Sequence, residues 1–327
     1  MKSLIPESAI LPRNSPSFGH HKVAPLLYFK RLHATAIALR LAWQFGWNFP
    51  RNRVIALLRL LFMKVIRKAL TIAGSDSGAG AGIQADLKTF AALGVYGTSA
   101  ITAITAQNTV GVTQVLALNP KLVGAQIDAV IDDIGAHALK TGMLANGAII
   151  DIVAKKIREH RLKNIVVDPV MVATSGDLLI EKMAVTALRT KLIPLANVVT
   201  PNIAEAEELT GMTLRTLEDA REAARQIIKM GTKTVVIKGG HLKGPALDLF
   251  YDGKNFTALS APRIRTKNTH GTGCTFSAAI AAYLAKGEKI DRAVVLAKKF
   301  ITRAIQSSFS IGAGHSPVHH FHQFWKI

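Results

Sequence analysis

From residue 69 onward, short apolar segments alternate with amphipathic segments, and this alternation limits the possible folds more than any other feature. Residues 69–73 and 164–167 are apolar runs of strand length, whereas residues 80–93 and 216–230 carry apolar side chains at helical spacing. Strands separated by helices form parallel sheets with helices on both faces. The sequence therefore predicts a three-layer α/β fold with a mostly parallel central sheet.

Further segments continue this pattern. A hairpin is expected around Asp252-Gly253, a dipeptide typical of tight turns between strands. The other expected strands are 96–105, 137–141, 197–200 and 234–237, and the other expected helices are 120–134, 273–285 and 291–307.

Glycines and polar residues follow the predicted strands directly. In parallel sheets, ligands bind beyond the carboxyl ends of the strands, where such residues from distant parts of the chain meet. The sequence therefore predicts one site along one edge of the sheet, formed by residues 74–82, 107–108, 142–143, 168, 202–205, 238–241 and 270–274.

Residues 1–62 differ from the rest and predict a separate basic extension ahead of a domain spanning 63–327. They hold nine lysines and arginines against one acidic residue, Glu7, and show no strand–helix alternation. An over-extended start, with translation beginning at Met63, and an Arg-rich transit peptide are the two interpretations. The apolar stretch 54–66 is interrupted by Arg59 and Lys64, which argues against a membrane span.

The net charge of +20 raises the question of nucleic-acid binding, but no zinc-finger spacing, heptad repeat or aromatic-rich basic strand accompanies it. We expect neither a nucleic-acid nor a membrane partner. The single cysteine, Cys274, excludes an intrachain disulfide and indicates a reducing, cytoplasmic setting.

The sharpest motif is Asn268-Thr-His-Gly-Thr-Gly-Cys-Thr-Phe-Ser277, which opens a predicted helix. Gly271 and Gly273 allow close backbone approach, and together with Thr272 they would direct helix-start N–H groups at an anion such as a phosphoryl group. A thiol in the first helical turn has a lowered pKa, so we expect Cys274 to act as a base. The alternative is that Cys274 is a small buried packing residue.

The loop Gly74–Gly82 is not a nucleotide fingerprint. Its glycines do not follow G-x-G-x-x-G, it lacks the Lys-Ser/Thr of a P-loop, and no acid occurs between Asp86 and Asp128 where a dinucleotide site needs one. A dinucleotide-binding function is therefore disfavoured.

Carboxylates at strand ends suit Mg²⁺ bound through water and ATP phosphates, which predicts roles for Asp168 and Glu205. Asn202 and Glu205 lie on one side of a turn, and Lys238 would contact ATP phosphates or line the adenine side. The alternatives are a helix-capping Glu205 and a strand-end Lys238 that only extends to solvent.

Many ordered motifs resemble the hydroxymethylpyrimidine/phosphomethylpyrimidine kinases of thiamin biosynthesis, which are ribokinase-like. Related sugar and nucleoside kinases usually carry Asp where Cys274 stands. The resemblance spans about 63–327 and rests on segments 73–77, 80–90, 106–109, 141–144, 168–171, 200–205, 237–241, 269–274 and 317–322.

The resemblance implies ATP as co-substrate, Mg²⁺ as cofactor, a homodimer, and phosphorylation of a hydroxymethylpyrimidine and then of its monophosphate. It implies that Gly74, Asp86 and Gln107 contact the pyrimidine and that Met143 packs on its ring. The alternatives are a pyridoxal kinase and a non-catalytic pyrimidine-binding protein. The histidines at 315, 319, 320 and 322 are expected in packing or a subunit contact rather than in a metal site.

Overall fold

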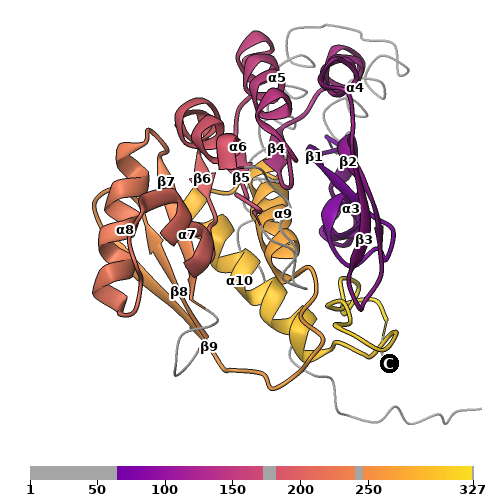
Figure 1. The fold of residues 1–327 in the computed structure, drawn as a ribbon. Coiled ribbons are helices and arrows are strands. Elements are labelled where there is room, and N and C mark those ends of the chain that lie inside the picture. Colours follow the sequence, from indigo (N-terminus) through magenta and orange to yellow (C-terminus); the bar gives the residue numbers. More distant parts are fainter. Residues whose placement is uncertain (1–64, 172–181, 240–245, 326–327) are drawn as a thin grey trace, which may run out of the picture. The chain divides into compact units, whose positions relative to one another are not determined.

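The structure is a computed structural model that describes residues 65–171, 182–239 and 246–325 (Figure 1). The predicted extension 1–62 and His241 lie outside these residues. The strands are β1 (Lys68–Asp76), β2 (Tyr96–Gln107), β3 (Val112–Ala117), β4 (Ala138–Thr141), β5 (Ile165–Val167), β6 (Val198–Val199), β7 (Thr234–Gly239), β8 (Ala246–Tyr251) and β9 (Phe256–Ala261). The helices are α3 (Gly82–Ala92), α4 (Pro120–Asp133), α5 (Gly147–Glu159), α6 (Lys182–Ala187), α7 (Ile203–Thr210), α8 (Leu217–Lys229), α9 (Thr272–Ala285) and α10 (Ile290–Gln306), with short turns η1 (Leu188–Leu192) and η2 (Ile193–Leu195).

Within the described residues, nine strands form one sheet in the order β3-β2-β1-β4-β5-β6-β7-β8-β9. The pairings from β2 to β7 are parallel, whereas β3, β8 and β9 pair antiparallel with their neighbours. The short connections 108–111 and 252–255 explain these edges, because a short loop can only join antiparallel strands. The predictions of a mostly parallel sheet and of the Asp252-Gly253 hairpin are confirmed.

The strand order changes direction at β1. Strands β2 and β3 lie on one side of β1, and all later strands lie on the other side. The carboxyl ends of the strands at such a point form a crevice where α/β proteins commonly bind ligands.

Alternate residues of the central strands enter two hydrophobic cores, one on each face of the sheet. One core contains Leu70, Leu139, Val167, Val199 and Val235, packed with residues of α4, α5, α6, α7 and α8. The other contains Ala69, Ala138, Val166, Val198 and Val236, packed with Phe90 of α3, Phe276 of α9 and Phe300 of α10. Helices therefore cover both faces, as the sequence predicts.

The helices begin at the expected signals. Pro120 lies in the first turn of α4, and Asn119 accepts a hydrogen bond from the backbone N–H of Lys121. Thr216 and Asp219 form a capping box at the start of α8. None of the helices in the described ranges is long and apolar enough to cross a membrane.

Candidate active site

A cavity with a volume of about 720 Å³ lies at the carboxyl edge of the parallel strands. Its walls come from the segments that follow β1, β2, β4, β5, β6 and β7, and from the start of α9. Every residue that was assigned an individual role from the sequence, except Asp86, lines it: Gly74, Gln107, Met143, Asp168, Asn202, Glu205, Lys238, Gly271, Thr272, Gly273 and Cys274. Residues from distant parts of the chain therefore meet around one space at this edge of the sheet.

The amino-terminal end of α9 forms one wall of the cavity. Its N-cap residue, Gly271, has a φ of 75°, and no side chain caps it. A Cβ atom at this position would overlap the carbonyl oxygen of Gly80, so the helix start packs directly on the loop that follows β1. The N–H groups of a first helical turn lack intrahelical acceptors, and the helix dipole adds partial positive charge. This end of α9 therefore suits an anionic group.

A cation lies beside the same helix start. The Nζ atom of Lys238 is 2.9 Å from Oδ1 of Asp168 and 3.7 Å from Oε2 of Glu205. It would lie 3.1 Å from a Cβ atom at Gly273. Burial opposes the charged form, but the two carboxylates hold the pKa of Lys238 above its usual range. A permanent positive charge therefore stands next to the N–H groups of α9.

Asp168 is buried at the end of β5 and accepts three side-chain hydrogen bonds. Its donors are Thr200 at 3.1 Å, Ser277 at 3.0 Å and Lys238 at 2.9 Å. Burial raises the pKa of this carboxyl, but Lys238 and Lys140 outweigh that effect and bring it below its usual range. Asp168 is therefore a carboxylate at neutral pH.

Glu205 and Asn202 form a capping box at the start of α7. The side chain of Asn202 accepts the Glu205 N–H at 2.9 Å, and Oε2 of Glu205 accepts the Asn202 N–H at 2.7 Å. Burial, together with the negative charge of Asp168, raises the pKa of Glu205 to about 7 although Lys238 opposes the rise. Both features expected of Glu205 are present, since it caps the helix and also lines the cavity.

Cys274 lies in the first turn of α9 and lines the cavity, but the expectation of a lowered thiol pKa is wrong. Burial raises the pKa of Cys274 to about 11. The ammonium of Lys140 and the backbone N–H of Gly82 favour the thiolate, but they do not offset the loss of hydration. The helix start alone therefore does not activate this sulfur.

Asp86 lies beneath the cavity rather than at its surface. Its oxygens are 3.0 and 2.8 Å from Nζ of Lys140, and Oδ2 accepts a hydrogen bond from Thr71 at 2.6 Å. The side chains of Asp86 and Lys140 have no solvent exposure. Lys140, unlike Asp86, also lines the cavity. The implied contact between Asp86 and a substrate is therefore replaced by a contact with Lys140.

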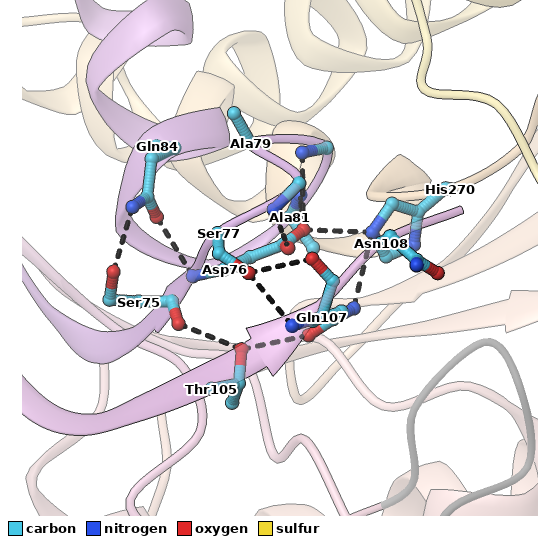
Figure 2. A network of polar contacts seen from close by, with 12 residues as sticks. Ser75, Asp76, Ser77, Ala79, Ala81, Gln84, Thr105, Gln107, Asn108 and His270 are labelled. Carbon is cyan, nitrogen blue, oxygen red and sulfur yellow. Dashed lines mark hydrogen bonds and ion pairs between the residues drawn. The ribbon is translucent and has the colours of Figure 1, made fainter. Parts of the chain in front are cut away.

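Asp76, Gln107 and His270 form a network that joins the end of β1, the end of β2 and the segment before α9 (Figure 2). Asp76 accepts the N–H groups of Gly78 and Ala81, both at 2.8 Å, and its Oδ2 is 2.9 Å from Nε2 of His270. Nε2 of Gln107 lies 3.4 Å from Nε2 of His270. Burial opposes the charged form of Asp76, but His270 and the loop N–H groups hold its pKa below its usual range. The network fixes the loop after β1 against the start of α9.

Gly74 and Met143 meet at the wall formed by the ends of β1 and β4. A Cβ atom at residue 74 would lie 2.5 Å from Cε of Met143, so glycine leaves the room that the methionine occupies. Both residues line the cavity, together with Gln107. This wall combines an apolar, polarisable surface with one side-chain amide.

Residues 314–320 contact segments that flank the site. Gly314 N–H donates to Thr109 Oγ1 at 3.2 Å, and the His270 N–H donates to the carbonyl of Ser316 at 3.1 Å. His320 Nε2 lies 3.0 Å from Oγ1 of Thr275, one residue after Cys274. Burial lowers the pKa of His320 to about 3, so the ring is neutral. In the described residues no cluster of three metal-binding side chains is found. His319 and His322 pack against the aromatic rings of Trp325 and Phe300.

Several cavity residues had not been singled out from the sequence. Asp76 and His270 stood within recognised motifs, but nothing in their spacing indicated contact. Lys140 gave a readable signal, because it is a lone charge in the buried strand Ala138–Thr141. Lys298 of α10 and Asp248 of β8 also line the cavity and form an ion pair at 2.7 Å.

The mostly parallel sheet and the cavity beside an uncapped glycine-rich helix start are the features of an α/β protein that binds an anionic ligand, as small-molecule kinases do. A profile of the family described as phosphomethylpyrimidine kinase matches residues 76–319. The chain belongs to this family.

Similar proteins agree with that placement. A hydroxymethylpyrimidine/phosphomethylpyrimidine kinase of Rhizobium meliloti is 55% identical over 264 residues, covering 79% of this chain and 98% of the relative. The protein of the same description from Bacillus subtilis is 51% identical, covering 78% of this chain and 95% of the relative. An ADP complex of Bacillus subtilis pyridoxal kinase has a TM-score of 0.74 at 47% identity, covering 78% of this chain and 97% of that structure.

Proposed function

We propose that this protein transfers the γ-phosphate of ATP to the hydroxymethyl oxygen of 4-amino-5-hydroxymethyl-2-methylpyrimidine and then phosphorylates the monophosphate, in thiamin biosynthesis. The observation that carries the proposal is the position of Cys274, which shares one cavity with the start of α9 and with Gln107 and Met143. Relatives described as kinases of this pyrimidine and its phosphate, at 51% and 55% identity, support it. We assign the fold to the ribokinase-like class on the same grounds.

In the first transfer, the anionic form of Cys274, which Lys140 and the Gly82 N–H favour, accepts the hydroxyl proton while the substrate oxygen attacks the γ-phosphorus. The bond between this phosphorus and the oxygen bridging to ADP breaks, and ADP leaves. The N–H groups of Gly271, Thr272, Gly273 and Cys274 and the ammonium of Lys238 hold the transferring phosphoryl group. In the second transfer the acceptor is an ionised phosphate, so the base matters less.

The carboxylates of Asp168 and Glu205 fit a magnesium ion held through water and ATP phosphates. Both line the cavity, and both approach Lys238, so they share one region of the site. Two carboxylates without further carboxylate or imidazole ligands are typical of Mg²⁺ rather than of a closed protein cage. When bound there, Mg²⁺ neutralises charge on the ATP phosphates.

On the substrate side, Gln107 pairs with the polar edge of the aminopyrimidine, because a side-chain amide offers both a donor and an acceptor. Met143 packs on the ring and Gly74 leaves room for it. Asp86 acts through Lys140 and makes no direct contact with the substrate.

A second candidate is a pyridoxal kinase, favoured by the likeness to the Bacillus subtilis pyridoxal kinase structure. Gln107 favours the pyrimidine, because its amide matches an amine beside a ring nitrogen. The proposed enzyme acts in the reducing cytoplasm. It is proposed to be a homodimer, and light scattering of the purified protein tests this oligomeric state.

The deciding experiment measures ATP-dependent turnover of three acceptors: the hydroxymethylpyrimidine, its monophosphate and pyridoxal. ADP release is followed in the presence of Mg²⁺, and products are identified by chromatography. We expect a higher kcat/KM on the pyrimidine than on pyridoxal, with the Cys274→Ala variant as a control for contaminating kinases on these two alcohols. A higher kcat/KM on pyridoxal would overturn the assignment, and pyrimidine binding without ADP release would identify a binding protein.

A further inference from the structure

A fully buried ion pair lies beneath the cavity floor. Because side chains alternate along β4, the Lys140 side chain lies on the face of the sheet that α3 and α9 cover. Thr71 is the neighbour of Lys140 on β1, and its side chain lies on the same face. Asp86 reaches the same layer from α3 and binds the Lys140 ammonium at 2.8 and 3.0 Å. Two neighbouring strands and one helix therefore hold this charge in place.

Stability alone does not explain this pair. Removing two ions from water costs several kcal/mol per ion, and apolar residues of similar size often stabilise a core equally well. Apolar residues such as Phe90 and Phe276 pack in the same layer, beside the buried polar residues Thr71 and Asp168. Lys140 is among the residues that line the cavity, whereas Asp86 is not. This arrangement presents a positive charge to the site.

The sulfur of Cys274 lies where these elements meet. Helix α3 packs against α9, and α9 packs against β4. The backbone N–H of Gly82, at the start of α3, faces the sulfur, and Asp86 lies one turn further along the same helix. The charged side chains that act on the thiol are Lys140 and Lys238, which favour its anion, and Asp86 and Asp168, which oppose it.

We infer that Lys140, held by Asp86, is a positioning residue for the proposed base and stabilises the anionic form of the Cys274 sulfur. The inference rests on the proposed function, in which Cys274 accepts the hydroxyl proton. Because the helix start does not offset the burial of the thiol, a fixed cation beneath it supplies part of the missing stabilisation. Burial disfavours the charged form of Lys140, but Asp86 holds its pKa above its usual range, so this cation persists over the working pH range.

The test uses the full chain without ATP or substrate. Cys274 is the single cysteine of the sequence, so alkylation measured by mass spectrometry reports this sulfur alone. Rates with neutral iodoacetamide and anionic iodoacetate are measured from pH 7 to 9.5 for the wild type, Lys140→Gln and Thr71→Val. Thr71→Val is the matched control, because it removes a hydrogen bond from the same cluster and leaves both charges.

We expect Lys140→Gln to lower the iodoacetamide rate by about tenfold at each pH, since a thiolate fraction falls tenfold per unit of pKa. The ratio of iodoacetate to iodoacetamide rates should fall as well, because the anionic reagent loses an attraction. Thr71→Val should stay within about twofold of the wild type in both measurements. Where circular dichroism shows Lys140→Gln unfolded, the double variant Asp86→Asn with Lys140→Gln retains a neutral pair. The alkylation rate of this double variant should also fall, because Lys140 acts on the thiol more strongly than Asp86.

Wild-type rates in Lys140→Gln would overturn the inference. Equal losses in Lys140→Gln and Thr71→Val with an unchanged reagent ratio would also overturn it, because they would identify a packing effect. Since no phosphoryl transfer is measured, a protein that failed to phosphorylate the pyrimidine could still show the expected alkylation pattern. The two proposals can therefore fail separately.

Discussion

Replacing Gly271 by alanine tests the contact between the start of α9 and the loop after β1. Gly271 has a φ of 75° and Gly287, after the end of the same helix, has a φ of 89°. Alanine at either position adopts a left-handed conformation that costs about 1–2 kcal/mol. At Gly287 no atom lies within 4 Å of the added Cβ, so this strain is the whole cost. At Gly271 the Cβ overlaps the Gly80 carbonyl and comes 3.3 Å from Cα of Ala81, so the helix start and the loop must separate.

The expected result follows from this difference. Gly287→Ala should lower the melting temperature by about 2–6 °C and keep its activity within about twofold of the wild type. Gly271→Ala should lower kcat by about 10²–10³-fold, as the loss of a positioned donor to a transferring group typically does. ADP release and thermal unfolding are measured on both variants. A wild-type kcat in Gly271→Ala would refute the placement of the phosphoryl group at this helix start.

Four further predictions concern the site and the extension. Cys274→Ala should lower transfer to the alcohol by about 10²–10⁴-fold and transfer to the monophosphate much less, because only the alcohol must lose a proton; equal losses would move the base elsewhere. Gln107→Ala should weaken pyrimidine binding by roughly 1–3 kcal/mol in calorimetry, whereas Asn108→Ala, outside the cavity lining, should not; an unchanged affinity excludes Gln107 as a ring contact. Glu205 has a pKa of about 7 in the fold against 4.5 in the unfolded chain, so the wild type loses stability as pH rises between these values. A pKa difference of this size corresponds to about 3 kcal/mol, so Glu205→Gln should melt about 7–14 °C above the wild type at pH 8 and level with it at pH 4; parallel melting profiles would contradict this. Deleting residues 1–62 should leave kcat/KM unchanged, because the family match begins at residue 76, and loss of activity would make the extension part of the enzyme.

Most of the fold could be predicted because the central strands and their helices follow regular periodicities. The segments at β1, α8 and the hairpin of β8 and β9 carry both a hydrophobic pattern and a start or turn signal. Strand β3 went unpredicted because its residues 113–117 are exposed, so burial imposes no alternation on them. Helix α5 was also missed, although Ile149, Ile150, Val153, Ala154 and Ile157 form a buried face; a count of helical spacing over 147–159 would have found it.

The site was predictable in composition but not in contacts. Strand ends and glycines located Gly74, Asp168, Lys238 and the start of α9, because backbone geometry places them at one edge. The ionisation of Cys274 was not predictable, because the loss of hydration depends on three elements that pack around the sulfur. The burial of Asp86 was not predictable either. Neither its sequence neighbours nor the family motif shows whether the carboxylate faces a ligand or faces Lys140.

The contacts that close the site also determine when it can form during folding. Asp76 and His270 are 194 residues apart in sequence, and Thr109 and Gly314 are 205 residues apart. Contacts of this span form after local strand–helix units, because a long chain segment must first be ordered. A chain leaving the ribosome therefore completes β1 and β2 long before residues 270–320 are available to complete the pocket (Figure 1). Nascent chains should consequently be unable to bind either substrate, and ligand binding reports the completed fold.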